Sequence, residues 1–150
     1  MTLHRLANIQ VCVGIASVAV GILLVIAPGT PLFSTYERSI AVAIVGMKGF
    51  DEGQRNLVHW LLATCGAGVV GWGIAWIMIS HIPLRRGERW AYRCLWISLL
   101  AWAGLDFFIA WRFGVTGEIV FVLCAFFAAW FPMLLGRRVF AEAEKGMIRS

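Results

Sequence analysis

Apolar residues fall into four long runs separated by polar segments. The runs cover residues 6–27, 57–80, 90–111 and 118–135. A hydrocarbon layer about 30 Å thick requires roughly 20 apolar helical residues per crossing, and each run meets or approaches that length. The runs are continuous and do not alternate with a period of two, so they predict helices and not strands. The pattern indicates an all-α integral membrane bundle of four transmembrane helices, formed as a single domain by residues 1–150.

The longest segment between two runs is the loop over residues 30–56. Ser34 and Glu37 have the spacing of a helix capping box, and the apolar residues 39–47 are too few to cross a membrane. We predict an interfacial or re-entrant helix here, lying across the mouth of the bundle. Such a loop is either a lid or a plain connector, and a connector is the commoner case.

Composition supports lipid as the main solvent of the chain. Hydrophobic residues make up 61% of the sequence, charged residues make up 14%, and the mean hydropathy is +0.82. A chain of 150 residues with this composition has too much apolar surface for one soluble core.

The net charge of +5 is explained by the positions of the basic residues. With four crossings, nine basic residues share one side and four lie on the other. The larger group consists of Arg5, Arg85, Arg86, Arg89, Arg93, Arg137, Arg138, Lys145 and Arg149. The positive-inside rule then predicts that both termini, the Arg85 turn and the tail 137–150 are cytoplasmic, and that the loop 30–56 is outside. We expect membrane lipids as partners of this basic surface, chiefly at Arg85, Arg86, Arg89, Arg137 and Arg138, and no nucleic acid.

Asp106 is the main candidate for chemistry, because a charged side chain inside a spanning helix costs a few kcal/mol and usually faces the bundle interior. Ala103 and Ala110 lie on the same side of the helix at spacings of three and four, which favours an inward position for the carboxyl group. Thr64 of the second run lies at a similar depth and His59 lies nearer the surface. These two residues are the predicted partners of Asp106.

Two interpretations of Asp106 remain open. It is either a buried carboxyl group that fixes how the helices pack, or a group that handles protons or orients a ligand, with His59 as its partner in acid–base catalysis.

Tryptophan is abundant, with eight residues in the chain. Trp60, Trp90, Trp111 and Trp130 lie near the ends of runs, as expected of an interfacial aromatic belt. Trp72, Trp76, Trp96 and Trp102 lie deeper. They either fill space between helices or line a site for a flat apolar ligand such as an isoprenoid, a sterol or a pigment. The predicted ligand-binding residues are Trp72, Trp76, Trp102 and Thr64.

The second run also has small residues at intervals of four: Ala63, Ala67, Gly71 and Ala75. Such a strip predicts a packing face, because helices in lipid associate through close contact of small residues. The sequence leaves open whether the strip meets another helix of the chain, a second copy in a homo-oligomer, or a larger membrane complex. The four cysteines are spread one per run without metal-ligand spacing, so we predict neither a metal site nor a cofactor.

The turn Pro-Leu-Arg-Arg-Gly-Glu-Arg-Trp-Ala over residues 83–91, followed by Trp102 and Asp106 and preceded by a glycine-rich run, resembles a pattern of small uncharacterised four-helix bacterial inner-membrane proteins. The resemblance covers roughly residues 60–135. It implies a multi-pass protein of the bacterial inner (plasma) membrane and no particular activity. A weaker likeness to four-helix sterol-isomerase-like proteins rests on the tryptophans and the intramembrane acid.

The functional prediction is a small multi-pass membrane protein that acts as a non-catalytic subunit or as a binding module for a lipid or other apolar ligand. The alternative is a membrane-embedded enzyme or carrier for an apolar small molecule, with Asp106 as acid or base.

Overall fold

The computed structural model describes residues 2–31, 33–46 and 49–148, with side chains described as far as Arg137. Its elements are α1 (Leu3–Ile26), α2 (Ser34–Ile40), the π-helical turn η1 (Ala41–Val45), α3 (Glu52–Ile79), the π-helical turn η2 (Ser80–Leu84), α4 (Arg89–Phe113) and α5 (Thr116–Ile148). Four of the described helices, α1, α3 with η2, α4 and α5, are long and apolar enough to cross a membrane. The predicted all-α bundle of four spanning helices is confirmed.

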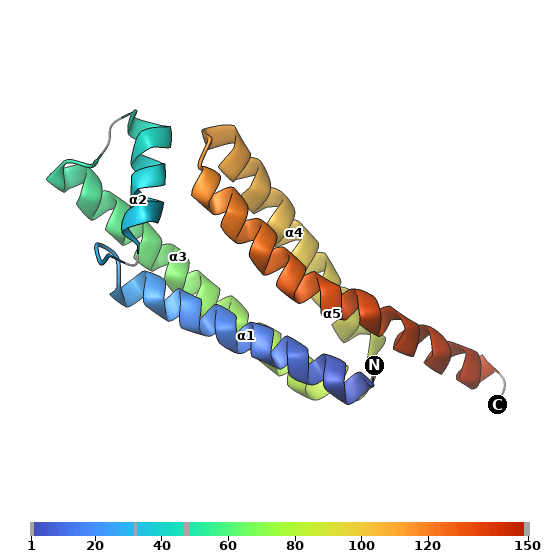
Figure 1. Ribbon diagram of the computed structural model, residues 1–150. Coiled ribbons are helices and arrows are strands. Elements are labelled where there is room, and N and C mark those ends of the chain that lie inside the picture. Colours follow the sequence, from blue (N-terminus) through green and yellow to red (C-terminus); the bar gives the residue numbers. More distant parts are fainter. Residues whose placement is uncertain (1, 32, 47–48, 149–150) are drawn as a thin grey trace.

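The four long helices form two antiparallel pairs, α1 with α3 and α4 with α5 (Figure 1). The pairs approach each other at the end that holds the N-terminus, and they diverge toward the other end, where α2 lies between them. We call the first part the basal half and the second part the open half. The N-terminus, the Arg85 turn and the C-terminal part of α5 all lie at the basal end.

Two glycines on each helix hold the first pair together. Gly14 and Gly21 of α1 face Gly73 and Gly66 of α3, and a methyl group added at Gly66 would lie 2.6 Å from the Gly21 carbonyl oxygen. The backbones therefore touch, which is how helices in lipid gain packing energy without hydrophobic exclusion. The spacing of seven residues keeps both glycines of each helix on one face.

The predicted small-residue strip of α3 is not the face that packs within this chain. Ala67, Gly71 and Ala75 are exposed, Ala63 is half-buried, and nothing lies within 4 Å of a methyl group built on Gly71. Sequence spacing alone could not separate this strip from the one formed by Gly66 and Gly73. Contact of the exposed strip with a second copy or a larger complex stays a prediction.

A continuous core fills the basal half. It contains Leu6 and Ala7 of α1, Trp76 of α3, Leu84 of η2, Ala91, Leu95 and Leu99 of α4, and Ala129 and Met133 of α5. The Tyr92 hydroxyl donates to the Met133 carbonyl at 2.8 Å and ties α4 to α5. All four long helices therefore meet here.

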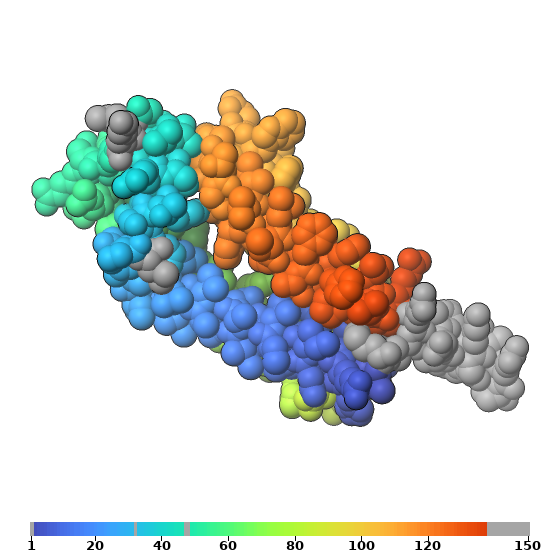
Figure 2. Space-filling view, viewed as in Figure 1, coloured from blue at the N-terminus to red at the C-terminus, as the bar shows by residue number. Residues whose placement is uncertain are grey.

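The two pairs separate in the open half. Several buried residues here lie outside the basal core: Ala103 and Ala110 of α4, Val122 of α5, and Leu62 and Gly66 of α3. Figure 2 shows the surface hollowed between α1 and the α4–α5 pair. We call this space, between the two pairs on the side of α2, the open cleft.

Three boundaries differ from the sequence prediction. Residues 52–56 were expected in the loop, but they begin α3, because Asp51 and Gln54 form a capping box with reciprocal backbone hydrogen bonds. Ser34 does not cap α2: its hydroxyl donates to the Pro31 carbonyl at 2.8 Å. The predicted short helix begins at Ser34 itself.

The fourth span also continues past its predicted end at residue 135. Pro132 lies inside α5, and the helix includes the segment that was expected to be a separate tail. A proline is tolerated in a spanning helix when its surroundings accommodate the lost backbone hydrogen bond. The predicted surface residue Arg138 lies outside the described side chains.

Candidate functional site

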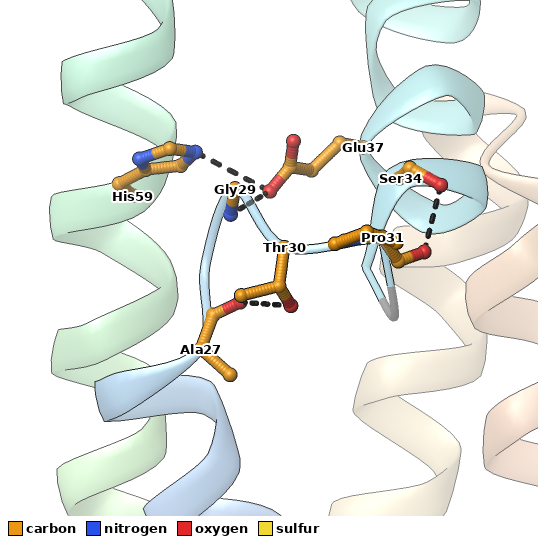
Figure 3. A network of polar contacts seen from close by, with 7 residues as sticks. All are labelled: Ala27, Gly29, Thr30, Pro31, Ser34, Glu37 and His59. Atoms are coloured by element: carbon orange, nitrogen blue, oxygen red, sulfur yellow. Dashed lines mark hydrogen bonds and ion pairs between the residues drawn. The ribbon is translucent and has the colours of Figure 1, made fainter.

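Glu37 of α2 joins two other segments at the open end. Its Oε1 atom accepts a hydrogen bond from the Gly29 backbone N–H at 2.7 Å and lies 3.3 Å from Nε2 of His59 on α3 (Figure 3). Both side chains are largely covered, with exposed fractions of 27% for His59 and 14% for Glu37. These contacts connect α2 to the α1–α3 pair.

The neighbouring residue Tyr36 makes the contact on the opposite side. Its hydroxyl donates a hydrogen bond to Oε2 of Glu118, at the start of α5. Burial is the largest effect that raises the pKa of Tyr36, followed by the hydrogen bond and the charge of Glu118 and by the charge of Asp106. The phenol is therefore a neutral donor at neutral pH, and it connects α2 to the α4–α5 pair.

Asp106 of α4 is half-buried, and its charge contributes to the raised pKa of Tyr36. Within the described part of the chain, no hydrogen bond or ion pair is formed by Asp106. It is thus a half-buried carboxyl group without a fixed partner, one helical turn beyond Trp102.

The predicted partners of Asp106 are engaged elsewhere. His59 contacts Glu37, and the Thr64 hydroxyl donates to the Trp60 carbonyl of its own helix at 2.9 Å, on an exposed face.

The deep tryptophans divide into two kinds. Trp76 is 2% exposed, and its Nε1 donates to Oε1 of Gln10 at 3.2 Å. Gln10, itself fully buried, donates through Nε2 to the Ala129 carbonyl at 3.1 Å, so that α1, α3 and α5 share one polar connection. Trp76 therefore fills the basal core and has no surface to offer a ligand in this structure.

Trp72 and Trp102 lie at the boundary between the two halves. Their ring centroids are 5.9 Å apart, and those of Trp72 and Trp76 are 4.8 Å apart. Both Trp72 and Trp102 are half-buried, in contrast to Trp76. Both side chains pack against the basal core.

Four residues of the site were not selected from the sequence: Tyr36, Glu37, Glu118 and Gln10. Glu37 looked like a capping residue, and Glu118 looked like the polar start of a span. Gln10 is the one of these four residues that the sequence could have indicated, because an amide inside an apolar run needs a buried hydrogen-bond partner. The Tyr36–Glu118 contact joins residues 82 positions apart, so only the tertiary structure reveals it.

The arrangement joins a phenol of α2 and a carboxyl group of α5 in one hydrogen bond, and Asp106 of α4 forms none among the described residues. Among the described residues, no group of three His, Cys, Asp or Glu side chains could hold a metal ion.

Comparison with protein-family models, with curated proteins and with solved structures finds no match for this chain.

Proposed function

We propose that this protein is a non-catalytic binding module of the membrane, which holds a lipid or another apolar molecule in the open cleft. The observation that carries the proposal is the divergence of the two helix pairs beyond Trp72 and Trp102. A ligand with an apolar body would stack on these indoles and fill the space that lacks a shared core. Its polar end would reach Asp106, which has room for a hydrogen bond.

The proposed setting is a bacterial inner membrane, with both termini and the Arg85 turn in the cytoplasm. The distribution of arginines supports this orientation, since Arg5, Arg85, Arg86, Arg89 and Arg137 belong to elements that meet at the basal end. The open cleft would then face the outer leaflet.

Native mass spectrometry of the full chain, extracted from the membrane in which it is made, tests the binding. We expect an apolar molecule that survives mild detergent and rebinds after delipidation when a lipid extract of that membrane is returned. Trp102→Ala should weaken the affinity about fivefold, since stacking on one aromatic side chain contributes on the order of 1 kcal/mol. The matched control is Trp111→Ala, which removes a tryptophan that is 69% exposed near the end of the same helix. Equal retention by both variants, or no retained molecule, would refute the proposal.

A second candidate is an enzyme or carrier for an apolar small molecule, favoured by the proximity of Asp106 to Tyr36 and Glu118. Asp106→Asn distinguishes the two functions, because it keeps the size and hydrogen bonding of the side chain but removes its acid–base chemistry. Under the binding proposal, the variant retains the molecule and the molecule is recovered unchanged in both proteins. A chemically altered molecule that accumulates only with the wild type would favour the enzyme.

A further inference from the structure

The segment formed by α2 and η1, residues 34–45, contributes little to the packed interior. It has one buried residue, Ala41, whereas Val42 and Ile44 are 55% and 59% exposed. Elements with so few buried apolar contacts open locally more readily than the core does.

Glycines with left-handed backbone conformations flank this segment. Gly29, before α2, has φ of 79°, and Gly46, the C-cap of η1, has φ of 71°. A residue without a side chain can change between such conformations with little steric cost. A methyl group on Gly46 would meet nothing within 4 Å, so packing does not fix this end.

Two side chains hold the segment across the open end, one to each helix pair. Glu37 contacts Gly29 and His59 on the side of α1 and α3, and Tyr36 contacts Glu118 of α5. A shallow groove lies between this segment and the turn from α4 to α5. Thr35, Ser39 and Thr116 are among the residues that line it. The segment also packs closely at Gly117 of α5, where a methyl group would lie 2.9 Å from Ser39 Oγ. The side-chain hydrogen bonds and the ion pair that hold it to the two pairs are nevertheless few.

We infer that α2 and η1 form a hinged lid over the open cleft, latched to one pair by Glu37 and to the other by Tyr36. This inference rests on the proposed function for its purpose, since the lid would control entry to the binding space. In the closed form, the Tyr36 hydroxyl donates to Glu118 at the open end. Opening moves the phenol away and leaves Glu118 and Asp106 to the incoming molecule.

The latches are weak enough for spontaneous opening. Individual hydrogen bonds and partly exposed ion pairs contribute modestly to stability in water, because water offers equivalent partners. An open form populated on the order of 0.1–10% is typical of such two-state elements. A ligand that contacts Glu118 and Asp106 would favour the open form by binding it selectively.

Hydrogen exchange measured by mass spectrometry on the full chain in phosphatidylcholine nanodiscs, with no ligand added, tests the lid. Tyr36→Phe and Glu37→Ala each remove one latch. Ser34→Ala is the control because its hydroxyl donates to the Pro31 carbonyl, three residues earlier, and so contacts neither helix pair. We expect exchange over residues 34–45 to accelerate about three- to tenfold with each latch variant, and more when they are combined. Ser34→Ala should match the wild type, and the α4 core around Leu95 and Leu99 should remain protected in all proteins.

Unchanged exchange over residues 34–45 would overturn the lid, and so would an equal acceleration in the α4 core, which would mean that the whole bundle loosens. Failure of both single latch variants to assemble would also overturn it, because a lid is dispensable for the bundle. The experiment contains no ligand, so its result is independent of the retention test above. A lid that opens as expected beside a cleft that retains nothing would refute the proposed function alone.

Discussion

The basal and open halves use the same four helices in different ways. In the basal half, the helices share one core, and buried polar groups are satisfied within it, as Gln10 and Trp76 show. In the open half, each pair packs only on itself, and polar side chains meet through α2. The α1–α3 glycine contact therefore supplies a rigid frame, while a few side chains of α2 set the distance between the two pairs in the open half.

The largest expected effect is on the basal core. Trp76→Ala should lower the free energy of unfolding by roughly 3 kcal/mol, because it leaves a cavity among tightly packed side chains and removes the partner of Gln10. Trp111→Ala, at an exposed position, should change it by less than about 0.5 kcal/mol. Thermal or denaturant unfolding in detergent measures both. Similar losses in the two variants would contradict the division into halves.

A smaller effect is expected at the frame between α1 and α3. Gly66→Ala places a methyl group against the Gly21 carbonyl, so the helices must separate, at a cost of about 1–3 kcal/mol. Gly71→Ala on the open side of the same helix should be neutral or slightly stabilising in the monomer, since nothing lies near it and alanine favours helix. Their unfolding curves, measured in parallel, check this.

If Gly71→Ala instead shifts the protein to a lower oligomeric state in light scattering, the exposed strip is an interface between copies. That result would support the predicted homo-oligomer and leave the α1–α3 frame unchanged.

The smallest effect concerns the latch and depends on pH. A tyrosine in the unfolded chain ionises near about pH 10, and the folded protein raises the pKa of Tyr36 above that value. The folded state therefore holds the proton more tightly, so the stabilisation is complete below about pH 10 and decreases as the pH rises above it. Tyr36→Phe should be less stable than the wild type by about 1 kcal/mol at neutral pH.

The difference between the wild type and Tyr36→Phe should shrink between about pH 10 and pH 11. Unfolding of both proteins over this range, in the same detergent, measures it. A constant difference would show that the phenol is not protected by Glu118 and by burial.

The candidate site was only partly predictable. Asp106 could be selected because it is a charged residue inside an apolar run. Ala103 and Ala110 on the same face of the helix predicted that its side chain points into the bundle. The structure places Glu37, and not Asp106, in contact with His59. The roles of Asp106 and His59 in catalysis or binding stay predictions. Tyr36 and Glu118 could not be found, because neither residue is unusual in its own segment.

The sequence by itself predicted lipid as the surrounding medium, four spanning helices, and the end of the bundle at which basic residues gather. Each of these depends on length, hydropathy or charge along single helices. The sequence also predicted Ala63, Ala67, Gly71 and Ala75 as a packing face of the second span. The tertiary structure instead packs Gly66 and Gly73 against α1, because close approach requires glycines on both facing helices at matching heights. The same holds for the open cleft: the separation of the pairs, and the latches that bridge it, arise from contacts between residues far apart in the chain.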